Sequence, residues 1–191
     1  MSFIEQIIEK DKELLVFINA LGNEQWDGFW LFVTNKFTWI PLYILITFLL
    51  FKHYGWKKAL TLMLLVALLV TFADQFVNLI KNYFQRLRPN NDPVLKNIIR
   101  VVKNSQDYSF VSGHATTSFA VSVFMILSLK KWSRYIYFVL IWPILFFMSR
   151  MYLGVHYPID VTAGLLLGVL IGYLFYRLSL WVLVKVGSGK T

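Results

Sequence analysis

The chain has 191 residues, 58% of them hydrophobic, and a mean hydropathy of +0.59, which is more apolar than an ordinary soluble domain. It contains no cysteine, which excludes disulfides, thiolate metal ligands and a cysteine nucleophile. The net charge of +9 does not indicate a nucleic-acid partner, because most basic residues lie in short stretches beside apolar segments.

The first predicted element is an amphipathic helix over residues 3–20, which begins an N-terminal segment of residues 1–27. The first 28 residues hold six acidic side chains and no long apolar run, so no cleavable signal peptide is predicted. The helix is too charged to span a membrane, and we expect it to lie at the interface. A sixth crossing would arise only if this helix inserted.

A transmembrane bundle is predicted over residues 28–184. It contains five apolar stretches, each about long enough for a ~30 Å hydrocarbon core. They lie near residues 28–51, 59–80, 112–129, 135–151 and 158–184. The first stretch contains Asn35, Lys36 and Pro41, so we expect it either to bend or to begin as an interfacial helix. The predicted fold class is therefore an all-α integral membrane protein with five spans in a single domain, residues 1–191.

The charges of the short loops predict the orientation. Basic residues are found in the loops 52–58 and 130–134 and in the predicted cytoplasmic tail, 185–191. Five spans bring these stretches to one side, which the positive-inside rule makes cytoplasmic. The N-terminal helix and the long 82–111 connection then face the periplasm or exterior. That connection is also basic, which the rule does not explain.

Glycines repeat at four-residue spacing in the last predicted span, at Gly164, Gly168 and Gly172. Small residues at this spacing allow helices in a membrane to approach closely. The pattern therefore predicts tight packing of the last span against a neighbouring helix.

Polar residues gather at the outward ends of three segments. They are Lys81 and Arg88 after the second span, Ser112, Gly113 and His114 at the start of the third, and Arg150, His156 and Asp160 around the last turn. The predicted topology brings all of them to one membrane face, where ionisable groups are costly and usually functional. The cations Lys81, Arg88 and Arg150 suit a phosphate, since arginine offers a planar fork and lysine a point charge.

The two histidines indicate phosphoryl transfer. Ser112 is expected at the N-cap of the third span, where free backbone N–H groups favour an anion, and Gly113 allows close approach. Asp160 lies one helical turn after His156, so its carboxylate is placed to accept a ring N–H and leave the other nitrogen free to attack phosphorus. His114 would supply a proton, and the cations would stabilise the phosphoryl group without a metal or another cofactor.

These residues resemble the signature of the type 2 phosphatidic acid phosphatase family, which shares its site with vanadium haloperoxidases and bacterial acid phosphatases. The signature reads K-x6-R-P, then P-S-G-H, then S-R-x5-H-x3-D. Lys81, Arg88 and Pro89 match its first part, Ser112, Gly113 and His114 its second, and Ser149, Arg150, His156 and Asp160 its third. The resemblance covers roughly residues 59–172.

The resemblance implies a role for each matching residue. His156 would be the nucleophile, Asp160 its partner and His114 the general acid. The phosphate would be held by Lys81, Arg88, Ser112, Gly113 and Arg150. Val111 replaces the usual proline; because neither side chain is catalytic, we expect a change in the loop and retained chemistry.

Two groups of polar residues stay outside the predicted site. Asp74 shares a helix face with Asn78 and Lys81, and it either orients a cation of the site or forms a buried contact between spans. The loop residues Arg86, Lys96, Arg100 and Lys103 either attract an anionic head group or belong to a solvated loop. The solvated loop is the preferred interpretation.

The sequence predicts a metal-independent lipid phosphatase of a bacterial inner membrane, acting through a phosphohistidine on a lipid phosphate within the bilayer. Candidate substrates are undecaprenyl diphosphate, phosphatidylglycerol phosphate and phosphatidic acid, with lipid A as an alternative. Transfer of the phosphate to another lipid is a second alternative, and a non-catalytic lipid-binding or transport protein is a more remote one. Neither the physiological lipid nor the oligomeric state follows from the sequence.

Overall fold

The structure, a computed structural model, describes residues 2–187, and no β-strand is found among them. The main helices are α1 (Phe3–Ala20), α2 (Glu24–Thr34), α3 (Ile40–Phe84), α4 (Gly113–Leu129), α5 (Ile141–Tyr152) and α6 (Pro158–Gly187). Short 3₁₀ turns lie at η1 (Lys36–Trp39), η2 (Pro89–Asn91), η3 (Leu95–Asn97) and η4 (Arg134–Leu140). The predicted tail begins inside α6, and its residues 188–191 lie outside the described part.

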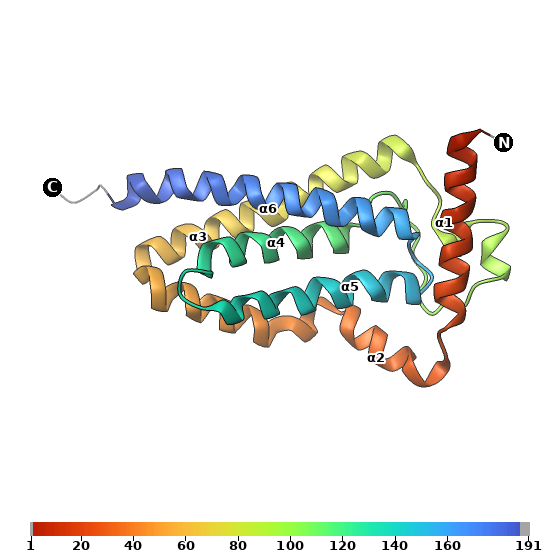
Figure 1. Cartoon of the computed structure of the whole chain (residues 1–191), viewed down its shortest axis with the longest axis horizontal. Coiled ribbons are helices and arrows are strands. Elements are labelled where there is room, and N and C mark those ends of the chain that lie inside the picture. The colour runs from red at the N-terminus through yellow and green to blue at the C-terminus, as the bar shows by residue number, and fades with distance from the viewer. Residues whose placement is uncertain (1, 188–191) are drawn as a thin grey trace.

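Helix α3 folds back on itself at Gly55. This residue has φ +72° and ψ 166°, a backbone conformation that is accessible to glycine and strained for other residues. Figure 1 shows the two limbs of α3, before and after Gly55, running in opposite directions along the bundle. The single helical element therefore supplies two passes.

The number of passes agrees with the sequence. By length and composition, the membrane-crossing helices of the described part are Lys36–Asn97, Arg134–Tyr152 and Pro158–Val186, with Gly113–Leu129 as a shorter apolar helix. Because the first of these turns back at Gly55, the chain forms a five-pass all-α bundle. The predicted fold class is confirmed.

The first predicted span, 28–51, is not one helix. Helix α2 ends at Thr34, and α3 begins only at Ile40. Asn35 causes the break, because its Oδ1 accepts a hydrogen bond from the Phe37 N–H at 3.0 Å and so caps a new turn. The Thr38 hydroxyl donates to the Phe32 carbonyl at 2.7 Å and satisfies the end of α2. Local polar capping thus outweighs the continuous apolar pattern.

Helix α1 lies across one end of the bundle, roughly at right angles to the other helices (Figure 1). Its bounds, Phe3–Ala20, match the predicted amphipathic helix. Leu15 is fully buried, and the buried Asn19 donates to the backbone carbonyls of Arg100 and Tyr152 at 3.0 and 2.9 Å. These contacts hold α1 against the loops at this end.

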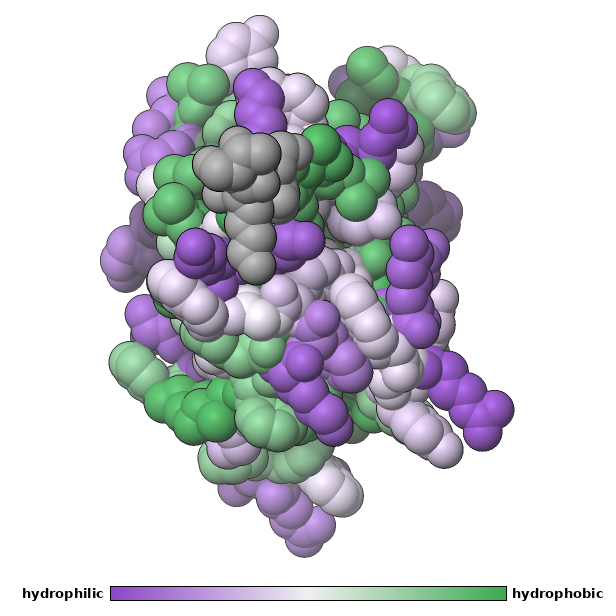
Figure 2. All heavy atoms as spheres, turned by 90° about the vertical axis from the view of Figure 1, so that its left-hand side faces the viewer, coloured by the Kyte–Doolittle hydropathy of each residue, from purple (hydrophilic) through white to green (hydrophobic). Residues whose placement is uncertain are grey.

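The opposite end carries the predicted cytoplasmic loops. The Tyr54 hydroxyl donates to the Ser128 carbonyl at 2.7 Å, and the rings of His53 and Trp132 stack at 5.1 Å, which joins the Gly55 turn to the loop after α4. Figure 2 views this end and shows hydrophilic side chains spread over it. The exposed lysines Lys52, Lys57, Lys130 and Lys131 lie in these two loops.

Helices α4 and α6 pack closely through the repeated glycines. A Cβ atom at Gly164, Gly168 or Gly172 would lie only 2.7, 2.4 and 2.4 Å from backbone carbonyl oxygens of Ser112, Thr116 and Ala120. A larger side chain would therefore force the helices apart. The predicted close packing is confirmed, and it fixes the start of α4 beside the start of α6.

Candidate active site

A cavity of about 1060 Å³ is lined by residues from distant parts of the chain. Six of the eight predicted site residues line it: Lys81, Arg88, Gly113, His114, Arg150 and His156. The other two lie behind His156, since the Ser112 N–H donates to the Asp160 carbonyl at 3.0 Å and Asp160 approaches the histidine ring. The structure therefore brings the three sequence segments together.

His156 occupies the centre of the site, in the short turn between α5 and α6. It is almost completely buried, and its Nε2 lies 2.9 Å from Nη1 of Arg88. Arginine offers only donors, so this contact requires the lone pair on Nε2 and leaves the ring proton on Nδ1. Nδ1 lies 3.4 Å from the Ser109 hydroxyl and 3.5 Å from Oδ2 of Asp160. The nitrogen that carries the lone pair, Nε2, is therefore on the side of the cations.

Burial lowers the pKa of His156 well below its ordinary value, and the positive charges of Arg88, Arg150 and Lys81 lower it further. A lowered pKa favours the neutral ring, because a second ring proton would add positive charge in a buried place that is already cationic. A neutral imidazole keeps a lone pair available at neutral pH. That is the form a nucleophile needs.

Asp160 accepts hydrogen bonds from three groups in addition to its predicted contact with His156. Its Oδ2 accepts hydrogen bonds from the Ser109 hydroxyl and, at 3.0 Å, from the Tyr157 N–H. Its Oδ1 accepts from Nη1 of Arg86 at 2.7 Å. Ser109 was absent from the predicted site, because it lies outside the signature and nothing in its spacing marks it.

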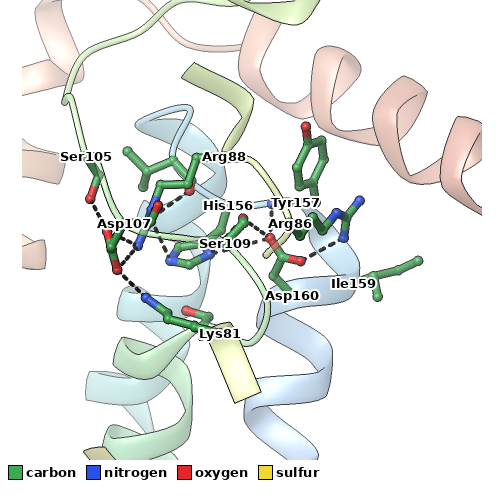
Figure 3. Close-up of polar contacts among 12 residues, drawn as sticks. Lys81, Arg86, Arg88, Ser105, Asp107, Ser109, His156, Tyr157, Ile159 and Asp160 are labelled. Atoms are coloured by element: carbon green, nitrogen blue, oxygen red, sulfur yellow. Dashed lines mark hydrogen bonds and ion pairs between the residues drawn. The ribbon is translucent and has the colours of Figure 1, made fainter. Parts of the chain in front are cut away.

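Arg86 is an ion-pair partner of two buried carboxylates, which corrects the solvated-loop interpretation. Its Nη1 pairs with Asp160 and its Nη2 with Asp11 of α1 at 2.6 Å. Its guanidinium also stacks over the Tyr157 ring, 3.8 Å from the ring centroid. Asp11 in turn accepts from the Ile159 N–H at 2.9 Å. Figure 3 shows Arg86 beside Asp160, and the ion pair of Arg86 with Asp11 connects helix α1 to this carboxylate.

Arg100 corrects the same interpretation, because its guanidinium pairs with both carboxylate oxygens of Asp27 at 2.9 and 2.8 Å. Lys103 lines the cavity, whereas Lys96 is exposed. The four loop cations therefore differ in their tertiary contacts: Arg86 and Arg100 pair with acids, Lys103 lines the cavity, and Lys96 is exposed.

Asp107 lies between two of the predicted phosphate-binding cations. Its carboxylate accepts from Lys81 and, at 2.9 Å, from Nη2 of Arg88, while the Ser105 hydroxyl donates to it at 2.8 Å. Burial alone would raise the pKa of Asp107, but the hydrogen bonds from Lys81 and Arg88 outweigh this and lower it. Figure 3 shows this group on one side of His156 and Asp160 with Arg86 on the other. A negative charge is therefore stabilised by Lys81 and Arg88, and Arg88 is also the cation that contacts Nε2 of the histidine.

Among the remaining predicted residues, Arg150 and Gly113 line the cavity and Ser112 lies beside it. The buried Arg150 donates from Nη1 to the Thr34 hydroxyl at 3.0 Å, and its Nε has no partner within residues 2–187. Ser112 is the N-cap residue of α4, but its hydroxyl caps nothing and is likewise buried without a partner in this part of the chain. At Gly113 an added Cβ would meet only Val77, at 3.5 Å, so packing alone does not require glycine there.

His114 lies in the first turn of α4 and lines the same cavity as His156. Its ring packs against Phe146 with centroids 5.5 Å apart. The two histidines thus face one space together with several cations, an arrangement suited to nucleophilic attack, proton donation and stabilisation of a phosphate.

Comparison with known proteins identifies phosphatases as relatives of this chain. The profile of the PAP2 superfamily matches residues 58–183. A lipid A 4′-phosphatase from Bacteroides thetaiotaomicron is 36% identical over 92% of this chain and 80% of that protein. An undecaprenyl-diphosphatase from Sulfolobus acidocaldarius is 31% identical over 92% and 81%.

A solved structure shares the fold. The crystal structure of a transmembrane PAP2-type phosphatidylglycerolphosphate phosphatase from Bacillus subtilis superposes with a TM-score of 0.69 at 20% identity, covering 91% of this chain and 86% of that one. The matched profile extends over most of α3, all of α4 and α5 and nearly all of α6, so it includes every predicted site residue. The chain therefore belongs to the PAP2 superfamily.

Proposed function

We propose that this integral membrane protein is a lipid phosphatase that removes phosphate through a covalent phosphohistidine on His156. The observation that carries the proposal is the 2.9 Å contact between Nε2 of His156 and Arg88, which directs the histidine lone pair towards the cations of the cavity. A phosphoryl group bound by Lys81, Arg88 and Arg150 would lie in front of this nitrogen.

The reaction consists of two in-line displacements. First, Nε2 of His156 attacks phosphorus and forms an N–P bond, while the bond from phosphorus to the lipid oxygen breaks. His114 gives a proton to the leaving oxygen, and the dephosphorylated lipid departs. Second, His114 accepts a proton from water, the water oxygen attacks phosphorus, and the N–P bond breaks to release inorganic phosphate.

The surrounding charges fit these steps. The proton on Nδ1 of His156 stays directed at Ser109 and Asp160. When phosphorylation makes the ring cationic, the carboxylate of Asp160 beside it therefore compensates the charge. Lys81, Arg88 and Arg150 offset the charge that builds up on the phosphoryl oxygens. The Ser112 hydroxyl and the backbone at Gly113 would add donors to the same oxygens.

We further propose that the substrate is a lipid of the lipid A class. The lipid A 4′-phosphatase relative matches more strongly, at 36% identity, than the undecaprenyl-diphosphatase relative, at 31%. An isoprenyl diphosphate is the second candidate on the same grounds. In a bacterial inner membrane the site would face the periplasm, because the exposed lysines Lys52, Lys57, Lys130 and Lys131 lie at the other end of the bundle.

The first test is phosphate release by the detergent-purified protein in the presence of EDTA. The substrates are lipid A, phosphatidic acid, phosphatidylglycerol phosphate and undecaprenyl diphosphate at equal mole fraction in the micelle. We expect turnover that EDTA leaves unchanged within about twofold, with lipid A the preferred substrate. Loss of activity in EDTA that added Mg²⁺ restores would contradict the metal-independent mechanism. Undecaprenyl diphosphate as the preferred substrate would contradict the lipid assignment.

Product analysis in the same assay separates hydrolysis from the other functions. Hydrolysis yields inorganic phosphate and an unphosphorylated lipid. Transfer yields a second phosphorylated lipid when a lipid alcohol is added, without a matching amount of inorganic phosphate. A lipid-binding or transport protein yields neither product while still retaining labelled lipid.

Asp107 gives a second prediction, because its carboxylate lies where it would compete with phosphate for Lys81 and Arg88. Replacing Asp107 with asparagine keeps the side-chain shape and removes the charge. We expect the inhibition constant for inorganic phosphate to fall about tenfold, since a competing anion has been taken from the binding site. The measurement is competitive inhibition of lipid hydrolysis. The exposed Glu24→Gln variant, with the same change in net charge, serves as control, and equal or weaker inhibition in Asp107→Asn would contradict the competition.

A further inference from the structure

The cavity extends well beyond the residues that hold the phosphate. It continues between the two limbs of α3 and along α4, with apolar walls that include Ile46, Leu50, Val66 and Met125. Met63, which also lines it, precedes Lys81 by eighteen residues, a rise of roughly 27 Å along a helix. The cavity therefore has the length and the lining of a groove for lipid chains.

A row of polar side chains interrupts the apolar wall. Thr71, Asp74, Gln75 and Asn78 line the cavity on the second limb of α3 and are exposed rather than packed between helices. This resolves the two interpretations of Asp74 that the sequence left open. Asp74 is neither a buried contact between spans nor the partner of Lys81, because Lys81 pairs with Asp107.

The negative charge of Asp74 has few stabilising partners within the part of the protein that the structure describes. Asn78 and Gln75 donate to its Oδ2 at 3.3 and 3.5 Å, which are long hydrogen bonds, and no ion pair to Asp74 is found within residues 2–187. A carboxylate inside a membrane-spanning helix is costly, and such residues usually mark a binding site or a pathway. Its position on the cavity wall supplies the place for a ligand.

The chemistry of the row selects among lipids. A carboxylate only accepts hydrogen bonds, whereas the amides and the hydroxyl donate and accept, so a complementary ligand must present O–H or N–H groups. Asp74 precedes Lys81 by seven residues, so these groups would lie about 10 Å along the helix from the lysine. A head group bearing hydroxyl and amide groups reaches that level with donors, whereas an isoprenyl diphosphate offers only hydrocarbon there.

We infer that Thr71, Asp74, Gln75 and Asn78 form a specificity subsite that binds the hydroxyl and amide groups of a phosphorylated glycolipid. The inference rests on the proposed function and narrows its substrate class to lipids whose phosphate is carried on an acylated amino sugar. The phosphate site provides the chemistry, and this polar row distinguishes sugar-based lipids from glycerol-based and isoprenyl lipids.

The test compares two phosphomonoesters in detergent at equal mole fraction. The first is a diacylated glucosamine 4-phosphate with one amide-linked chain, and the second is phosphatidic acid with chains of the same length. We expect Asp74→Leu to lower kcat/KM for the glucosamine lipid about tenfold or more, as expected for loss of a hydrogen bond to a charged group. Turnover of phosphatidic acid should stay within about twofold, which also reports that the variant is folded.

Two further variants complete the test. Asp74→Asn keeps the shape and an acceptor, so it should lose less than Asp74→Leu. Leu68→Ala changes an exposed apolar residue of the same limb and should alter neither substrate. An equal loss for both lipids, or no loss for either, would overturn the subsite. If the wild-type protein hydrolyses neither lipid, the proposed function itself fails, and the subsite fails with it.

Discussion

His156→Ala is expected to abolish phosphate release, with a loss on the order of 10⁴-fold or more, because it removes the nitrogen that forms the N–P bond. The contact between Nε2 and Arg88 and the buried Asp160 on the opposite side give this histidine its role. His114→Ala should lose less, about 10²- to 10⁴-fold, which is the range of a general acid–base group. The measurement is single-turnover hydrolysis of a ³²P-labelled lipid with an alkaline quench, under which a phosphohistidine survives.

The ³²P label on the protein identifies the nucleophile, because only the residue that attacks phosphorus becomes phosphorylated. Wild-type protein should carry transient label, and His156→Ala should carry none. His53→Ala is the matched control, because His53 lies in the Gly55 turn at the other end of the bundle and stacks on Trp132. Label that persists in His156→Ala, or activity near the wild-type level, would contradict the assignment of the nucleophile.

Arg86→Ala is expected to lower both stability and turnover, although Arg86 does not line the cavity. The substitution leaves the fully buried Asp11 and Asp160 carboxylates without their shared cation. We expect a loss of about 3 kcal/mol in the free energy of unfolding, because breaking a buried ion pair leaves uncompensated charge. Turnover should fall about 10²-fold, as when a group that orients a reactive residue is removed.

The kinetic signature distinguishes positioning from a general loss of structure. Because Arg86 acts through Asp160 on His156, kcat should fall while KM stays within about twofold, measured at a temperature where the variant remains folded. Arg86→Lys keeps one charge and should recover part of the activity. The exposed Lys96→Ala, in the same connection, is the control. A KM effect alone, or a loss of stability with unchanged kcat, would contradict the positioning role.

Much of the fold could be predicted from the sequence because membrane burial leaves a direct pattern. Apolar stretches of spanning length gave five passes, the basic loops marked one end, and glycines at four-residue spacing marked the contact between α4 and α6. The polar residues Asn35 and Lys36 marked the first span as irregular, and the structure places the break there, but the sequence did not identify the cap that causes it. A side-chain cap acts through one hydrogen bond, which hydropathy does not record.

Lys81, Arg88, Arg150 and the two histidines could be proposed as one site because three sequence segments fall at one end of a five-pass bundle. The sequence could not identify the groups that hold them. Ser109, Asp107 and Arg86 lie in an irregular connection with no period, so their partners depend on how that connection folds over the helix ends. For the same reason, the basic loop residues looked alike in sequence and differ in the structure.

The sequence by itself determined the membrane bundle, its two ends and the chemical groups gathered at one of them, since these follow from local apolar length, charge and motif spacing. Only the tertiary structure decided which groups pair, because pairing requires atoms 19 to 75 residues apart in the chain to come within hydrogen-bond distance. It set Asp107 between Lys81 and Arg88 and joined α1 to Asp160 through Arg86. It also turned Asp74 towards a cavity, since the direction of a polar side chain on a spanning helix depends on where the neighbouring helices leave space.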